Sequence, residues 1–366
     1  MEKLSSAVKL LLVLLLVIMG WAFYAWVTQL SSGLGVTGMN KPVLWGLYIV
    51  SFVFCIGISA GGIAVASLCH LAGIEKYKPI SRITELVAII SLIIAMAAIL
   101  LDLGRPDRLL NIFIYPQLTS PLTWDVVVIN IYLVLCLVLL WADLTGKHNI
   151  ARTFAYISIP VFVLVHSITA WIFGLMKSQP GWHTTILAPL FIISALVSGL
   201  ALVILALIFA RKFLGIGIEY ETIISLGGYF KILLPLLFYF LFSELITIGY
   251  AQVPEHFAIL KEIFTGKFAW VFWLDIIAGI VLPFLLLLSS AGRTVGGLGT
   301  ISFLCFIGVF AERVNIILPS FYHTLLPYSS SYSPTWVEWS LLAGLSAFGL
   351  FLFIISTRII PLKVKK

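Results

Sequence analysis

Several side chains that can exchange protons lie inside long apolar stretches of this sequence. Histidine titrates near neutral pH, and carboxylates can relay protons to water. A charged group at the centre of a bilayer costs on the order of 3 kcal/mol, so each such residue needs an explanation. The residues concerned are Asp125, His166, Glu244, Asp275, Glu312 and Arg313.

The composition shows what surrounds these groups. Of the 366 residues, 61% are hydrophobic and only 10% are charged, and the mean hydropathy is +1.15. Soluble proteins usually carry about a quarter of charged residues, so the composition predicts an integral membrane protein. The formal net charge of +7 comes from Lys and Arg at the ends of apolar stretches, which predicts a topology signal and not nucleic-acid binding.

A transmembrane helix needs about 20 mostly apolar residues, and the sequence predicts ten such helices in one membrane domain over residues 1–366. The stretch 8–30 is an extra helix, 43–176 holds four helices, 185–318 holds four more, and 336–360 is a second extra helix. The individual spans are 8–30, 43–72, 83–104, 122–143, 153–176, 185–210, 225–251, 268–290, 295–318 and 336–360.

The ends of the chain are predicted to lie in the cytoplasm. The first apolar run is longer than the core of a secretory signal and lacks a small-residue cleavage site before Leu30, so it is interpreted as a span. Lys and Arg are concentrated in the termini and in every second loop, which the positive-inside rule assigns to the cytoplasm. The loop that contains Arg105 and Arg108 is then outside.

The charged residues and His166 within the spans are predicted to lie at similar depths in the bilayer. Counting about 1.5 Å per residue from the inner end of its span, His166 lies roughly 21 Å into a hydrocarbon core about 30 Å thick. The same counting puts Glu244, Asp275, Glu312 and Arg313 in the outer half. Together they predict a proton-handling pocket that is open to the outer face.

Structural explanations compete with this interpretation. Glu312 and Arg313 can pair to satisfy neighbouring helices, and His166 can hydrogen-bond a facing helix. Asp125 lies close to the start of its span, after Ser120 and Pro121, where it can cap the helix.

Bound redox groups are not predicted in this chain. A b-type haem between helices needs two His at matching depth, and His166 has no such partner by sequence position. The four cysteines lie singly inside apolar runs, without CxxC or metal spacing, so disulfides, a metal site and protein-ligated iron–sulfur clusters are not expected.

Small residues mark two spans as close-packing helices. They are the second and the sixth, rich in Gly, Ala and Ser around Gly61 and Gly199. Each is the first of a set of four, which hints at a duplicated four-helix unit.

Three stretches resemble the NrfD/PsrC family, the quinone-reactive membrane subunits of respiratory oxidoreductases. They are WGLYIVSFVFCIGISAGG (45–62), LDLGRPDR (101–108) followed by SPLTWDVVVINIY (120–132), and PVFVLVHSITAWIFGLMKSQPGWH (160–183). The ten spans and YSPTWVEW (332–339) are similar to the longer branch of that family, which includes DsrP and hydrogenase-2-type membrane subunits.

The resemblance implies an all-α fold of two four-helix bundles with one extra helix at each end. It also implies menaquinone or ubiquinone as an exchangeable substrate, no haem or metal in this chain, and a ferredoxin-like iron–sulfur subunit docked on the outer face. His166 and Asp125 would be catalytic, and Glu244, Asp275, Glu312 and Arg313 would form a proton path. The residues that would bind the quinone are Tyr48, Asp102, Arg105, Trp124, His166 and Trp182.

The resulting expectation is a membrane subunit that exchanges electrons between a quinol and an iron–sulfur partner. Further catalytic or cytochrome subunits would complete the complex. A secondary transporter or proton-conducting subunit also uses intramembrane acids and helical repeats, and it remains an alternative. A passive membrane anchor is a third hypothesis, and it leaves the buried acids without a role.

Overall fold

The computed structural model describes residues 5–71, 75–322 and 331–360, and every regular element in these ranges is helical. Ten helical segments are long and apolar enough to cross a membrane, as predicted. Their elements are α1 (Ser6–Ser32), α2 (Leu47–Leu71), α3 (Ser81–Asp102), α5 (Pro121–Leu144), α6 (His148–Gly174), α7 (Leu187–Leu214), α8 with α9 (Tyr220–Gly227 and Phe230–Ala251), α11 with a π-helical turn and α12 (Ala269–Trp273, Leu274–Val281 and Leu282–Leu288), α13 (Val295–Ile317) and α14 (Trp336–Ile359).

Short elements connect the spans. They are η1 (Leu34–Val36), η2 (Glu75–Ile80), η3 (Pro106–Arg108), α4 (Asn111–Ile114), α10 (Pro254–Thr265), η5 (Ser290–Arg293) and η6 (Pro319–Tyr322). The short connection between the eighth and ninth spans is η5, where the Ser289 hydroxyl accepts from the Ala291 N–H. Of the predicted basic termini, Lys3, Lys363, Lys365 and Lys366 lie outside the described residues.

Span boundaries differ from the predicted ones by a few residues. The second helix begins at Leu47 and not at residue 43, whereas the fifth begins at His148, before the predicted residue 153. Hydropathy alone cannot place a helix end, because apolar residues such as Val43 and Leu44 also occur in the connection before a helix.

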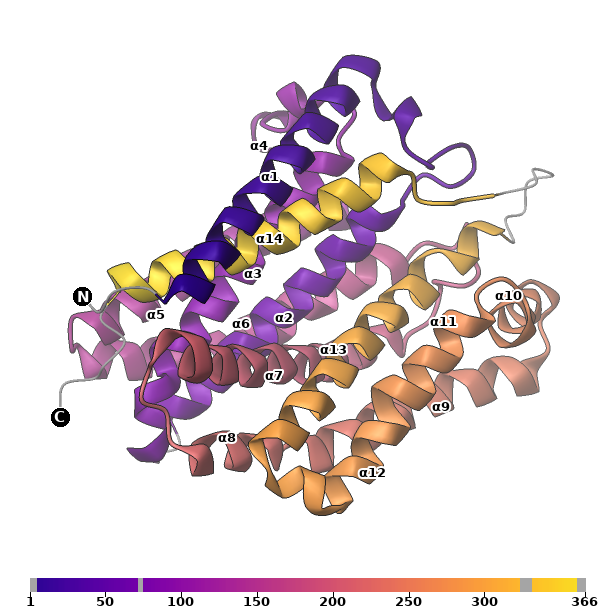
Figure 1. Ribbon diagram of the computed structural model, residues 1–366. Helices are drawn as coiled ribbons and strands as arrows, with labels where there is room; N and C mark the ends of the chain where they lie inside the picture. Colours follow the sequence, from indigo (N-terminus) through magenta and orange to yellow (C-terminus); the bar gives the residue numbers. More distant parts are fainter. Residues whose placement is uncertain (1–4, 72–74, 323–330, 361–366) are drawn as a thin grey trace.

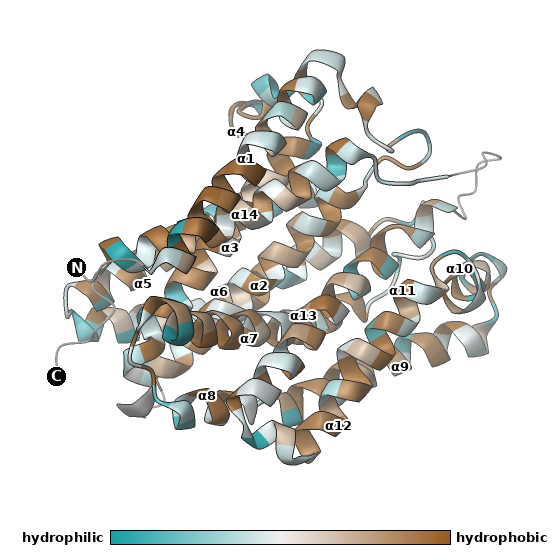
Figure 2. Cartoon of the chain, viewed as in Figure 1, coloured by the Kyte–Doolittle hydropathy of each residue, from teal (hydrophilic) through white to brown (hydrophobic). Residues whose placement is uncertain are grey.

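Hydrophobic residues predominate along the long helices (Figure 2). Large side chains such as Leu10, Trp270 and Leu285 are more than half exposed. Exposing such side chains to water is unfavourable, whereas contact with lipid is not. These helix faces are therefore suited to a bilayer.

The start of α1 and the end of α14 lie at the same end of the molecule (Figure 1). This end is called the proximal end below, and the opposite one the distal end. The start of α2 and the end of α3 are therefore distal.

The helices form two contacting groups. In the first helix group α2, α3, α5 and α6 pack on one another, and in the second helix group α7, α9, the α11–α12 span and α13 do so. Helices α1 and α14 pack together, and α14 also contacts α3 (Figure 1).

The two groups meet most closely where α2 crosses α7. A Cβ atom on Gly199 would overlap the backbone of Gly61 and Gly62, and one on Gly61 would overlap the backbone of Ala195 and Gly199. Small residues let the helix backbones approach in this way, and the gain is van der Waals contact over the length of both helices.

We expect Gly199→Leu to lower the free energy of unfolding by about 3 kcal/mol, because overfilling a packed contact costs about 1–3 kcal/mol and backbone atoms cannot move aside like a side chain. Unfolding in detergent, followed by circular dichroism, measures the change. Gly20→Leu on α1 is the control, since nothing lies within 4 Å of a Cβ there. Equal stability of the two variants would contradict the role given to this contact.

Candidate functional site

His166 and Asp125 lie in the first helix group, on facing helices. The Thr169 hydroxyl, one turn from His166 on α6, donates to Asp125 Oδ1 on α5 over 2.7 Å. Asp125 is buried and forms this bond across to α6, so its predicted alternative role as a helix cap is wrong.

The hydrogen bonds of His166 define its tautomer. Its Nδ1 lies 3.2 Å from the Phe162 carbonyl oxygen, which can only accept, so Nδ1 carries the proton. In the neutral imidazole Nε2 is then the acceptor. Nε2 is buried and has no hydrogen-bond partner among the described residues. An unsatisfied buried acceptor is costly, and it is suited to receive a donor from a ligand.

The residues predicted to bind one quinone do not lie together. Tyr48 and Asp102 belong to a second polar cluster, where α1, α2, α3 and α14 meet at the distal end. The Tyr48 hydroxyl donates to Gln29 Oε1 over 2.6 Å, and Gln29 Nε2 donates to the Leu101 carbonyl over 2.7 Å. Asp102 Oδ1 is buried and has no partner within the described ranges.

Beside that cluster, Glu338 of α14 forms hydrogen bonds with the connections at the distal end. One of its carboxylate oxygens accepts from the Tyr332 hydroxyl over 2.5 Å, and the other accepts from the N–H groups of Gly38 and Thr335. Tyr332 in turn accepts from the N–H of Leu47, the first residue of α2. Burial and the neighbouring Glu338 carboxylate raise the pKa of the Tyr332 phenol, so it stays protonated and remains a donor.

Trp182, Trp124 and Arg105 occupy three further positions. Trp182 is buried, stacks on Trp45 with ring centroids 5.4 Å apart, and donates to the Ile316 carbonyl, so it ties the distal end of α2 to α13. The Trp124 indole donates to the Leu118 carbonyl. Arg105 is exposed and pairs with Asp107, whose pKa it lowers from the ordinary value.

The four predicted proton-path residues do come together, in the second helix group. Arg313 donates to the Ser194 hydroxyl, lies 3.5 Å from Glu312 Oε1, and stacks over the Phe191 ring at 4.0 Å. Asp275 is within electrostatic range of both Glu312 and Arg313. Glu244 is within range of Glu312, and His166 is within range of Arg313. Arg313 is therefore within range of both the acids of this group and His166.

Asp275 lies in the π-helical turn Leu274–Val281. Four residues on, Gly279 touches the backbone of Gly308 on α13, which brings the turn directly against the helix that carries Glu312 and Arg313. Asp275 Oδ1 and Glu312 Oε2 are buried without hydrogen-bond partners in the described part of the chain. Such π-turns are rare and occur frequently at functional sites.

One buried cluster was missed by the sequence analysis. At the proximal end His70 Nε2 lies 2.8 Å from Glu85 Oε1, and Asp143 accepts from the Ser81 hydroxyl and from Arg82. Glu85 and Asp143 stand within a turn of a predicted span end, where acids are usually solvated, so their burial could not be seen from position.

This proximal cluster has the spacing of a metal site. Ligand atoms of His70, Glu85 and Asp143 lie within 4.8 Å of one another. The Arg82 guanidinium, however, already bonds to Asp143 over 3.3 Å and would repel a cation there. The arrangement pairs opposite charges, and it could hold a divalent ion only if Arg82 moved away.

Comparison with known proteins identifies the family. The sequence profile described as polysulphide reductase, NrfD, matches residues 35–324, and the chain belongs to this family. It is therefore a multi-pass integral membrane protein.

Three relatives illustrate the range of the family. The chain is 30% identical to the Hdr-like menaquinol oxidoreductase integral membrane subunit of Archaeoglobus fulgidus, over 96% of this chain and 93% of that protein. It is 23% identical to the menaquinone reductase, integral membrane subunit, of Nitratidesulfovibrio vulgaris, over 94% and 90%. It is 25% identical to a selenate reductase subunit of Mesobacillus selenatarsenatis, over 91% and 89%.

We expect Arg313→Met to lower the free energy of unfolding by about 3–5 kcal/mol, because removing one partner leaves the Glu312 and Asp275 carboxylates buried and uncompensated. The double variant Arg313→Met with Glu312→Gln should recover part of this loss. Thermal unfolding of the three proteins in detergent measures the effect. If the double variant were less stable than Arg313→Met, Arg313 would not be balancing the acids.

Proposed function

We propose that this chain is the quinol-interacting membrane subunit of a respiratory oxidoreductase complex. It exchanges electrons between menaquinol or ubiquinol in the bilayer and an iron–sulfur subunit of the complex. The names of its relatives, a menaquinol oxidoreductase subunit and a menaquinone reductase subunit, support a quinone as the substrate. The buried acceptor Nε2 of His166, one helical turn from the Thr169 hydroxyl that bonds Asp125, is the observation that carries the proposal.

Proton exchange at His166 and Asp125 is the proposed chemistry. A quinol that is oxidised loses two electrons and two protons. One ring hydroxyl donates to His166 Nε2, and the proton of the other passes to the Asp125 carboxylate. Thr169 orients that carboxylate through its 2.7 Å hydrogen bond. On quinone reduction the same groups return the protons.

In this proposal the electrons leave to a partner subunit, and no haem or iron–sulfur cluster of this chain takes part. Its four cysteines are free, and the one cluster with metal-ligand spacing in the described ranges contains no cysteine. Electron transfer directly between the quinone and the partner's cluster requires that the partner docks near His166.

The distal end is the proposed outer face and docking face, with both termini in the cytoplasm. The positive-inside rule supports this orientation, and the distal ends of α5 and α6 then carry Asp125 and Thr169. The connection between α3 and α5 exposes Arg105 and large apolar side chains such as Leu110 and Tyr115. The contacts within the two helix groups support the two implied bundles, with α1 and α14 as the extra helices.

Proton movement through the second helix group is a proposed addition. Arg313 lies within electrostatic range of His166, and Glu312 is within range of the buried Asp275 and the half-buried Glu244. These contacts favour coupling of quinone chemistry to proton transfer along Glu312, Asp275 and Glu244. A transporter or proton-conducting subunit without redox activity would use the same acids but would not need His166.

We expect His166→Ala and Asp125→Asn to lower quinol-linked electron transfer by about 10²–10⁴-fold, the usual contribution of a positioned acid or base. The assay follows quinol oxidation by the purified complex with its partner subunits. His148→Ala, exposed at the other end of the same helix, is the control and should keep full activity. Full activity of His166→Ala in an assembled complex would remove this site from the proposal.

We expect Asp275→Asn to keep quinol oxidation but to abolish coupled proton uptake in proteoliposomes. The amide keeps the volume of the side chain but cannot be protonated at neutral pH. A pH-sensitive dye inside the vesicles reports the proton movement. Loss of quinol oxidation together with proton movement would place Asp275 in the redox site, and unchanged proton uptake would exclude it from the path.

A further inference from the structure

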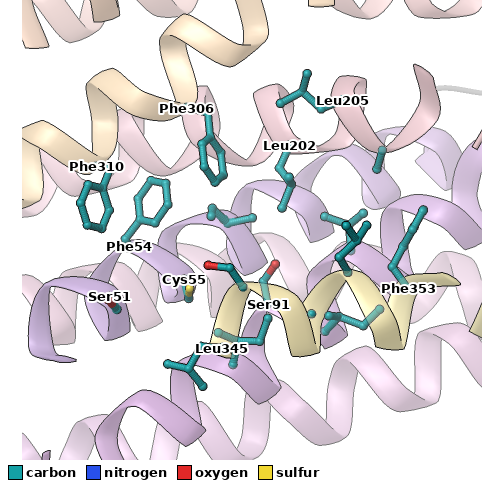
Figure 3. A pocket seen from close by; sticks show the side chains of 18 of the residues that line it. Ser51, Phe54, Cys55, Ser91, Leu202, Leu205, Phe306, Phe310, Leu345 and Phe353 are labelled. Atoms are coloured by element: carbon teal, nitrogen blue, oxygen red, sulfur yellow. The ribbon is translucent and has the colours of Figure 1, made fainter. Parts of the chain in front are cut away.

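A cavity of about 590 Å³ lies between α14 and the rest of the molecule (Figure 3). Its walls come from α2, α3, α7, α13 and α14, and they are almost wholly apolar, with Phe54, Phe306 and Phe310 among them. The hydroxyls of Ser51 and Ser346 bond to carbonyls of their own helices and offer little to a polar ligand. A cavity with such walls is not a stable place for water, whereas a hydrocarbon tail fits it.

The cavity reaches the apolar surface of the molecule. The lining residues Leu205, Phe306 and Ser346 are partly or fully exposed. In Figure 1 the ribbon of α14 runs on one side of α2 and those of α7 and α13 on the other. In a bilayer the cavity is therefore accessible from the lipid, and a hydrophobic molecule can enter it sideways.

The polar cluster of Tyr48 and Asp102 lies beyond the distal end of the cavity, about one turn past Ser51 on α2 and about two turns past Ile94 on α3. Tyr48 precedes Ser51 and Cys55 by three and seven residues, which places it on the cavity-facing side of α2. Asp102 follows Ser91 by eleven residues, three helical turns, on the same side of α3. Leu345 links the two regions, since it lines the cavity and also packs on the cluster that contains Tyr48 and Leu101.

The polar end has an excess of acceptors and of negative charge. Asp102 Oδ1 is buried without a partner in the described ranges, and the Glu338 carboxylate is within electrostatic range of Asp102. Arg105, three residues beyond Asp102, is exposed and pairs with Asp107. A phosphate head group would be repelled here, whereas a neutral head group that donates hydrogen bonds would satisfy Asp102.

We propose that this cavity is a second binding site for an isoprenoid quinol, with the isoprenoid tail between α14, α2 and α13 and a ring hydroxyl donating to Asp102. The proposal rests on the proposed function, since it takes the same class of substrate. It is a different place from the His166 site, because α2 separates the two. Ser51, Phe54, Cys55 and Ile58 of α2 face the cavity, whereas Ser59 bonds to Tyr132 of α5 and Ser67 to Ser158 of α6.

The test uses the purified complex and a menaquinone with a photoreactive diazirine in its tail. We expect crosslinks to cavity-lining peptides of α2 and α14. Ser346→Phe should reduce these crosslinks at least about tenfold, because the ring fills the mouth of the cavity. Ala343→Phe, on the lipid-exposed side of the same helix, should leave them unchanged. Ser91→Leu, a cavity-lining change on α3, should act like Ser346→Phe, so that a folding defect in one variant does not decide the result.

A separate experiment tests the proposed contact of the head group with Asp102. Asp102→Ala should lower the amount of quinone that co-purifies with the complex, measured by mass spectrometry, while the phospholipid content stays the same. Cavity peptides that crosslink equally in Ser346→Phe and Ala343→Phe, or a diazirine phospholipid that labels them in place of the quinone, would overturn the proposal. A complex that labels in the cavity but never oxidises quinol would instead refute the proposed function and leave the binding site standing.

Discussion

The contact of α2 with α7 is the constraint on which the other features depend. Because Gly61 and Gly199 lack side chains, the backbones of two long helices touch, and Gly57 continues the contact toward Ser198. Each of these helices belongs to one helix group, so their contact sets how the groups face each other. Along α7, the turn that carries Phe191 and Ser194 is then presented to Arg313, and the buried charges of the second group come within range of His166.

Burial of charge in this molecule follows two different rules. At the proximal end His70, Glu85, Arg82 and Asp143 pair with one another over short distances, as expected of groups that stabilise helix ends. Around His166, Asp102 and Asp275 an acceptor atom has no partner within the described residues. Glu85 Oε2 in the proximal cluster also lacks one, but Glu85 pairs with His70 through its other oxygen. Unsatisfied acceptors in a low-dielectric interior are costly unless a ligand or proton satisfies them, so these are the places where function best explains the cost.

Helices α1 and α14 do more than enlarge the molecule. Glu338 of α14 collects donors from Gly38, Thr335 and Tyr332, and through Tyr332 it also holds the start of α2. With its distal end held in this way, α14 packs on α3 and leaves the apolar cavity between itself and α7 and α13. A helix that merely anchored the protein in lipid would not need a buried carboxylate with three donors.

The sequence by itself determined the class of the protein. Hydropathy determines ten crossings because each needs about 20 apolar residues, and short family motifs around Tyr48, Asp125 and His166 identify the family. Which predicted residues act together was decided only by the tertiary structure. Position along a helix gives depth but not the direction of neighbours, so Tyr48 and Asp102 could be grouped with His166 although α2 and α3 separate them into distinct clusters. The same reason hid Glu85, Asp143 and the cavity beneath α14, since both burial and empty space are properties of packing between segments that are distant in the sequence.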